Sequence, residues 1–189
     1  MTLLILGLLA FHGLHSLRIL APDWRNAQVA RLGEQKWKGL YSLASIASFV
    51  LLVWGFAVAR PDAAILYEPP AAMKHINALL MLLALIAMMV FNLPAGRLKP
   101  MLKHPMLVSI KLWAFGHLLA NGDLASVLLF GSFLVWAVFD RISVKRRGDK
   151  GFAIAGPVRN DVLAVVSGVV IYGLFVWKLH DWLFGVPPL

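Results

Sequence analysis

Residues 39–59 contain no charged side chain, and this stretch constrains the fold more than any other feature of the sequence. A helix needs roughly 20 apolar residues to cross a bilayer core of about 30 Å. In lipid every backbone polar group must be bonded within the protein, so a spanning segment of this kind has to be a helix or part of a closed barrel. Residues 39–59 therefore predict a transmembrane helix.

Five more apolar segments occur along the chain, at residues 1–17, 75–96, 105–121, 124–139 and 162–177. We expect six helices, over about residues 1–20, 38–60, 73–94, 104–121, 123–142 and 160–184. The first segment has no basic start and no small-residue cleavage site, so we interpret it as a retained helix and not as a signal peptide. The predicted fold is all-α, a polytopic bundle of six transmembrane helices forming a single domain over residues 1–189.

The composition excludes several other classes of protein. Hydrophobic residues make up 60% of the chain and charged residues only 14%, against about 25% charged in an average soluble domain. The mean hydropathy of +0.78 is too high for a disordered chain. The absence of cysteine excludes disulfides, thiolate metal sites and cysteine nucleophiles.

The net charge of +9 arises from 18 basic and 9 acidic residues. The basic residues concentrate in the first, third and fifth connections, and the other two connections hold almost none. Basic loops face the cytoplasm, so both termini are expected outside it, in a bacterial inner membrane. The charge therefore indicates orientation and not nucleic-acid binding, although the run Lys145–Arg147 could also contact anionic lipid. These connections hold Arg25, Arg31, Lys36, Lys38, then Arg97, Lys99, Lys103, then Arg141, Lys145, Arg146, Arg147, Lys150 and Arg159.

Five of the six histidines lie in or beside predicted spans, where polar groups are costly and often functional. A single one of them could be a neutral imidazole bonded to a neighbouring helix. Imidazole also ligates metals, and haem iron needs only one or two histidines and an apolar pocket. Zinc or copper would need about three close ligands. The six are His12, His15, His75, His104, His117 and His180.

Helical geometry limits how these histidines combine. His12 and His15 are three residues apart and share one broad face. His104 and His117 are thirteen residues apart and point about 140° from each other, so they cannot face one ligand. Depth in the bilayer matches His117 with His75 and His104 with His15, and His12 would reach His117 more easily than His15 would.

Lys111 lies inside a predicted span, where a lysine needs an explanation. It could pair with an anion such as a haem propionate, or extend its amine to the interface. Ser167, Gly168 and Gly173 are expected to allow close helix packing. The sequence contains no catalytic triad, phosphate loop, carboxylate pair or dinucleotide fingerprint, so spacing alone indicates no reaction.

Several segments together resemble the NnrU family of bacterial membrane proteins, and the resemblance covers nearly the whole chain. Two parts of the sequence carry it, the two helices after the His-Pro pair and the opening of the chain. They are Lys103–Met106, Lys111–Asp123, Leu129–Gly131 and Trp136–Arg141, with His15–Ile19, Arg31–Glu34 and Trp37–Ser42.

The resemblance implies a role in nitrogen-oxide metabolism of denitrifying bacteria. It also implies kinship with zeta-carotene isomerase, a membrane protein that uses haem b to isomerise a cis double bond of a lipophilic substrate. By that kinship the axial ligands of the iron are a first-helix histidine and the histidine thirteen residues after His-Pro. The second is His117, and the first falls in the His12/His15 region, where His15 carries the family's His-Ser pair. The isomerase has a cysteine where this chain has Ala114.

Two other functions stay open. The pair His104-Pro105 is similar to that of isoprenylcysteine-type membrane methyltransferases, which bind S-adenosylmethionine. Here Met106 and Leu107 follow the pair instead of an aromatic residue, and Lys145–Arg147 replaces the acidic residues expected farther on. The other function is a non-enzymatic membrane assembly factor whose histidines only bond neighbouring helices.

Overall fold

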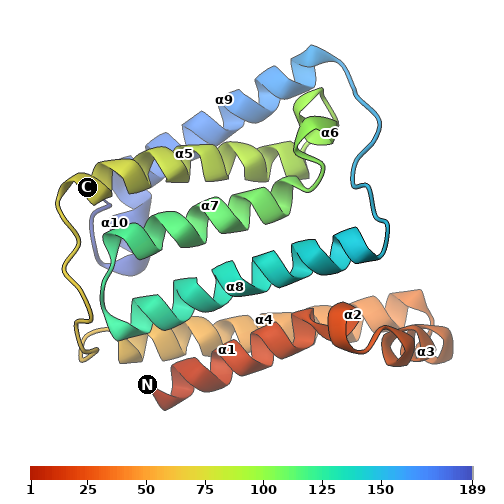
Figure 1. Cartoon of the computed structure of the whole chain (residues 1–189), viewed down its shortest axis with the longest axis horizontal. Coiled ribbons are helices and arrows are strands. Elements are labelled where there is room, and N and C mark those ends of the chain that lie inside the picture. Colours follow the sequence, from red (N-terminus) through yellow and green to blue (C-terminus); the bar gives the residue numbers. More distant parts are fainter. Residues whose placement is uncertain (189) are drawn as a thin grey trace. The chain divides into compact units, whose positions relative to one another are not determined.

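The computed structural model describes residues 1–188, and within them the chain forms helices and one isolated β-bridge, between Ile65 and Asp123. Figure 1 shows the helices in chain order. They are α1 (Thr2–His15), α2 (Leu17–Leu20), α3 (Pro22–Leu32), α4 (Glu34–Ala59), α5 (Ala72–Asn92), α6 (Leu98–Leu102), α7 (Pro105–Ala120), α8 (Leu124–Arg146), α9 (Val158–Leu174), the π-helical turn η1 (Phe175–Leu179) and α10 (His180–Phe184). The all-α prediction is confirmed for these residues.

Within residues 1–188, four helices are long and apolar enough to cross a membrane by length and composition, so this criterion covers four of the six predicted spans. They are α4, α5, α8 and the continuous helix over Val158–Phe184. The other two predicted spans, α1 and α7, are apolar but have only 14 and 16 residues. At 1.5 Å per residue they reach about 21 and 24 Å, less than a bilayer core of about 30 Å.

The first helix ends earlier than predicted, and an unpredicted helix follows it. α1 stops at His15, α2 contributes one turn, and α3 begins with Pro22 at its first position. Proline suits a first helical position because its missing N–H would have no partner there. α3 ends at Gly33, whose φ of +79° favours glycine. The segment expected to be a basic loop is therefore largely a helix.

The chain divides into two compact units, and the first comprises residues 1–67 and 123–132. In it α1 lies antiparallel against α4 (Figure 1). A Cβ at Gly7 would lie 2.6 Å from Leu52 Cα, and one at Gly55 would lie 2.6 Å from Leu4 N. Each helix thus supplies a glycine at the point where the other helix's backbone comes closest.

The second unit comprises residues 68–122 and 133–189, and α5 packs against both α7 and α9 in it. The buried hydroxyl of Ser109 on α7 donates a 2.8 Å hydrogen bond to the carbonyl of Ala84 on α5. A Cβ at Gly168 on α9 would lie 2.8 Å from Ile86 Cα. The prediction of close packing is confirmed at Gly168 but wrong at Gly173, where a Cβ would meet nothing within 4 Å.

Asp161, in the first turn of α9, joins that helix to the segment before α6. Its carboxylate accepts hydrogen bonds from the backbone N–H of Arg97 at 2.8 Å and of Leu98 at 3.0 Å. The carboxylate lies so close to Gly96 that a Cβ there would collide with it. An acidic side chain holds two otherwise unpaired N–H groups at the start of α6 in this way.

The long C-terminal helix is interrupted once. Residues Phe175–Leu179 form a π-helical turn, so the helix changes its winding between α9 and α10. Lys178, within that turn, pairs with Asp181 at 2.9 Å, and beyond the turn the imidazole Nδ1 of His180 donates to the carbonyl of Val186. Such turns arise inside otherwise regular α-helices.

Candidate functional site

His117 lies in the last turn of α7, and a hydrogen bond within the helix fixes its imidazole. The ring Nδ1 lies 2.9 Å from the backbone carbonyl of Trp113. Because a carbonyl can only accept, Nδ1 carries the proton, and Nε2 is the nitrogen that bears the lone pair. A histidine that ligates a metal through Nε2 commonly has its Nδ1–H bonded in this way.

Two aromatic rings and a side-chain amide surround His117. The Trp113 ring lies 5.6 Å from the imidazole centroid, and Phe133 meets Trp113 edge-on at 5.4 Å. The side-chain amide of Asn121 donates to the carbonyl of His117 at 2.9 Å. The end of α7 is thus capped by the residue that opens the Asn-Gly-Asp turn, and the imidazole sits beside two aromatic rings.

Gly116 brings α5 close to α7 next to His117. A Cβ at Gly116 would lie 2.5 Å from the Oδ1 of Asn77 and 2.8 Å from the Cε of Met81. The Oδ1 of Asn77 is buried and has no hydrogen-bond partner within residues 1–188. A buried acceptor that is left unbonded is costly, and this one lies against the residue that precedes His117.

His75 lies on α5 at the level of the end of α7, as the depth comparison predicts, but on another face. Asn77 contacts Gly116, and His75 is two residues earlier, which turns it about 200° around α5. His75 is exposed. The structure does not bring His75 and His117 together on one face, and the pairing of the two stays a prediction.

His15, the last residue of α1, repeats the arrangement of His117. Its Nδ1 donates to the carbonyl of Phe11 at 2.8 Å, so its lone pair also lies on Nε2. The imidazole stacks on the Phe11 ring, with centroids 4.1 Å apart, and meets Tyr41 edge-on at 5.7 Å.

His12 has the opposite tautomer. Its Nε2 lies 3.1 Å from the hydroxyl oxygen of Ser132. That hydroxyl already donates its proton to the carbonyl of Leu129 at 2.8 Å, so His12 must donate through Nε2–H. An Nε2 that bears a proton cannot ligate iron unless this bond breaks. Among the two first-helix histidines, the hydrogen bonds favour His15 over His12 as a ligand.

Lys111 and His104 lie elsewhere on the α7 segment. Lys111 is half-buried, forms no ion pair within residues 1–188, and points about 120° from His117 around α7. His104 precedes the buried Pro105 at the start of α7, and its Nε2 is buried without a hydrogen-bond partner among the described residues. The proposed role of Lys111 toward a propionate stays a prediction.

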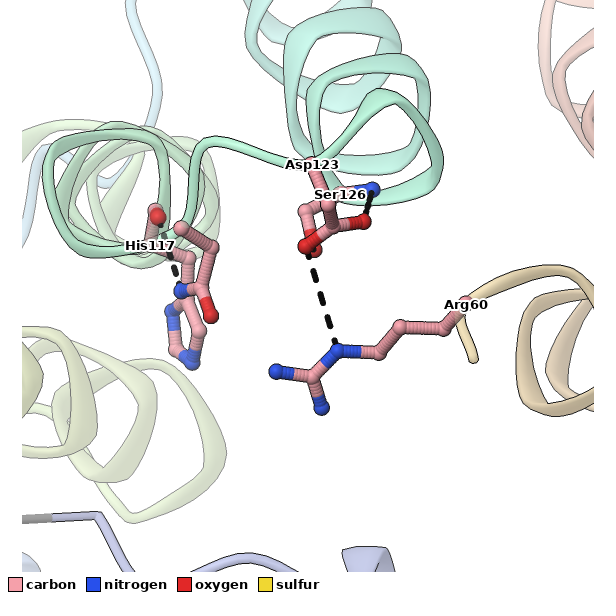
Figure 2. Close-up of polar contacts among 5 residues, drawn as sticks. Arg60, His117, Asp123 and Ser126 are labelled. Carbon is pink, nitrogen blue, oxygen red and sulfur yellow. Dashed lines mark hydrogen bonds and ion pairs between the residues drawn. The ribbon is translucent and has the colours of Figure 1, made fainter. Parts of the chain in front are cut away.

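The structure adds a buried carboxylate, Asp123, to which none of the sequence motifs above pointed. Figure 2 shows Asp123 bonded to Ser126 and paired with Arg60. Its oxygens accept from the Ser126 N–H at 2.8 Å and from the Ser126 hydroxyl at 2.6 Å, and the Nε of Arg60 lies 3.9 Å away. An Asp three residues before a Ser at a helix start is the pattern that would have identified this cap.

Within residues 1–188, the side chains that commonly bind metals are too scattered for a site with three ligands. No group of three His, Cys, Asp or Glu residues there could hold a metal ion. Protein sites for zinc need three or four such ligands. A haem iron needs only one or two nitrogen ligands, a number that single histidines on separate helices can supply.

A family model described as "NnrU protein" matches residues 3–188 of the chain. No curated protein and no solved structure matches it. The match covers the helices described above apart from Thr2, and it includes His15 and His117, whose lone pairs lie on Nε2. The chain is a helical membrane protein that belongs to the NnrU family.

Proposed function

We propose that this protein binds haem b and that His117 supplies an axial nitrogen ligand to the iron. The observation that carries the proposal is the bond from the His117 Nδ1–H to the carbonyl of Trp113, which leaves the lone pair on Nε2. Trp113 and Phe133 add the apolar, aromatic surroundings that a porphyrin requires. The resemblance to the isomerase points to the same residue.

His15 is the residue we propose for the second axial nitrogen, because its tautomer matches that of His117. His12, with its proton on Nε2, serves as a matched comparison three residues away on the same helix. His75 and Lys111 are secondary candidates from depth and charge. Each residue is tested by its own substitution.

Bound haem would supply an iron that changes redox state or binds a small ligand. That chemistry fits two roles, the isomerisation of a lipophilic substrate and the handling of a nitrogen oxide in denitrification. This chain's residues would bind and orient the group, while the apolar helices exclude water. We further propose six spans in a bacterial inner membrane, with both termini outside the cytoplasm and the short helices α1 and α7 as the first and fourth spans.

Absorption spectroscopy of the protein purified from haem-sufficient cells tests the proposal. We expect a Soret band that is lost or shifted in His117→Ala and partly restored by added imidazole, which can replace the missing ring. His15→Ala should change the spectrum from a two-histidine to a one-histidine type, while His12→Ala should leave the band position unchanged. A colourless protein that also fails to take up added haem would overturn the proposal.

A methyltransferase remains the second candidate because the Nε2 of His104 is buried without a partner among residues 1–188. Calorimetric titration with S-adenosylmethionine tests it, with His104→Ala as the comparison. Heat of binding that vanishes in His104→Ala would favour this function. A colourless protein that binds neither compound and works normally as His117→Gln would favour an assembly factor.

A further inference from the structure

The connection between α8 and α9 exposes apolar side chains within a strongly basic segment. Ile154 is 81% exposed and Phe152 is 41% exposed, and Ala153 and Ala155 beside them are exposed as well. Exposed basic residues flank this apolar tip at Lys145, Arg146, Lys150 and Arg159. Apolar side chains set among basic ones are typical of segments that lie in a membrane interface.

The connection has a defined conformation, because hydrogen bonds attach it to the segment before α7. The N–H of Phe152 donates to the carbonyl of Lys103, and the N–H of Gly156 donates to that of Gly96, both at 3.1 Å. The side-chain amide of Asn160 donates to the carbonyl of Ala95 at 2.8 Å. These bonds tie both ends of the apolar tip to residues 95–103.

A buried lysine orients the apolar tip. Lys99 is 7% exposed, and its ammonium donates to the carbonyl of Leu93 at 2.7 Å while it lies 4.7 Å from the centroid of the Phe152 ring. Phe152 also meets Phe91 edge-on at 6.5 Å. One side of Phe152 is therefore fixed against the protein by a cation–π contact, and Ile154, two residues on, is left facing outward.

The connection lies between two helices that can span a membrane, and this position indicates that lipid headgroups cover it. It joins α8 to the helix over Val158–Phe184, both of which are long and apolar enough to span a bilayer. A segment of ten or so residues between two such ends must lie at the membrane surface. Arg97 and Lys103, on the segment to which it is bonded, add two more exposed basic side chains to the same surface.

We propose that residues 150–159, together with Arg97 and Lys103, form a binding surface for anionic phospholipid. Ile154 inserts beside the acyl chains, and the basic side chains pair with headgroup phosphates. A charge pattern that only sets topology would depend on the number of basic residues. The surface proposed here depends on their position and on the bonded loop as well, so variants with equal charge should behave differently.

Because the chain has no cysteine, a single label can report on the apolar tip. Ile154→Cys in the full chain would carry an environment-sensitive fluorophore, in nanodiscs of phosphatidylcholine alone or mixed with phosphatidylglycerol. We expect a blue-shifted emission that brominated lipid quenches more strongly when phosphatidylglycerol is present. The control is Asp62→Cys, an exposed position in the connection before α5, which should not respond. Equal, water-like emission of the Ile154→Cys label in both lipids would overturn the proposal.

Phosphatidylglycerol titrated into the labelled, detergent-solubilised protein tests the basic residues. Each basic residue near a lipid surface contributes roughly fivefold in affinity, so Lys150→Gln with Arg159→Gln should weaken binding about 25-fold. Arg31→Gln with Lys36→Gln removes the same charge from exposed positions elsewhere and should change binding less than twofold. Equal losses in both double variants would overturn the proposal in favour of bulk charge.

Two further arms separate other occupants of the surface. Inorganic phosphate should not shift the emission, and a shift equal to that with lipid would assign the surface to free phosphate instead. An emission shift that follows protein density and not lipid composition would assign it to a second copy of the chain. Either result overturns the lipid proposal, and neither depends on whether haem is bound.

Discussion

In the first unit glycines on both α1 and α4 bring the two backbones together, and side-chain rings also meet across the pair. In the second unit the contacts of α5 include a hydrogen bond from a side chain to the backbone. Gly7 and Gly55 place the α1 and α4 backbones in direct contact. In the second unit the Ser109 hydroxyl on α7 donates to the carbonyl of Ala84 on α5, and Gly168 on α9 brings the backbone of α9 close to α5. Lipid gives no hydrophobic drive for helix association, so both units depend on close packing and hydrogen bonds. The difference is that in the first unit the closest backbone contacts between α1 and α4 occur at two glycines, Gly7 and Gly55.

The largest effect is therefore expected at Gly55. Gly55→Ala should lower the free energy of unfolding by about 3 kcal/mol, because the new Cβ meets the backbone of Leu3 and Leu4, which cannot rotate away. Gly13→Ala on α1 is the matched control, since a Cβ there meets nothing within 4 Å. Alanine favours helix over glycine, so this variant should be unchanged or up to about 1 kcal/mol more stable.

Denaturant unfolding in micelles, followed by tryptophan fluorescence, measures both glycine variants. Equal stability of Gly55→Ala and Gly13→Ala would contradict the backbone contact between α1 and α4.

A smaller, local effect is expected at Asp161 in the second unit. Asp161→Ala removes two hydrogen bonds to the N–H groups of Arg97 and Leu98 and should cost about 1.5 kcal/mol. Hydrogen exchange should accelerate at these two amides while the amides of α5 stay protected. Asp62→Ala, at an exposed position without such bonds among residues 1–188, is the control. Uniform acceleration throughout the unit would show that the contact is not local.

A still smaller effect is expected at Ser109. Ser109→Ala removes the bond to Ala84 and should lower the free energy of unfolding by about 0.6 kcal/mol, the average for hydrogen bonds between membrane helices. Ser167→Ala on α9 removes a hydroxyl that forms no side-chain hydrogen bond within residues 1–188. The two variants are compared by the same unfolding measurement. A loss above about 2 kcal/mol at Ser109 would show that the stability of the second unit also depends strongly on a single position.

The smallest effect concerns Tyr67, in the connection before α5. Burial raises the pKa of its phenol, and the negative charge of Asp123 raises it further. Its stabilising contribution is complete below the unfolded pKa near 10 and is lost as the pH rises through the folded pKa. Asp123→Asn should therefore lower the pKa of Tyr67 without returning it to its ordinary value.

Phenolate absorbance during an alkaline titration measures the pKa of Tyr67, in a background with Tyr41→Phe and Tyr172→Phe so that one tyrosine remains. An unchanged titration in Asp123→Asn would leave burial as the sole cause of the shift.

The apolar runs made the long helices predictable. The thickness of the bilayer sets the length of a span, and lipid requires the backbone of that span to bond internally, as a helix does. Residues 39–59 carry no charge, and α4 contains all of them. The true extent of α1 was less predictable, because its apolar run continues to Leu17 while the helix ends just before Ser16, where the backbone turns. Pro22 begins α3 and Gly33 follows its last residue, which are typical helix boundaries. The polar and apolar residues between them show no helical periodicity in hydrophobicity, so the sequence alone did not predict this helix.

The candidate histidines stand out in the sequence by their place in apolar segments and by the family resemblance, but their tautomers do not. Neither signal distinguishes the ring nitrogens of His12, His15 and His117. For His12 that distinction depends on Ser132, which lies 120 residues away in the sequence and accepts a hydrogen bond from its Nε2–H. The glycine contacts at Gly7 and Gly55 likewise depend on which helix becomes the neighbour, which a single sequence does not state.

The π-helical turn at Phe175–Leu179 has a consequence for the evolution of the chain. A π-turn holds one residue more than the α-helical turn it replaces, and it absorbs an insertion without breaking the helix. Removal of one residue there would restore a regular helix and leave the residues beyond the turn facing nearly the same way, whereas the same deletion in an α-helical turn would rotate them by about 100°. The exposed Trp182 would then keep its direction, so this turn is the place where the C-terminal helix tolerates a deleted codon without redirecting its aromatic residues.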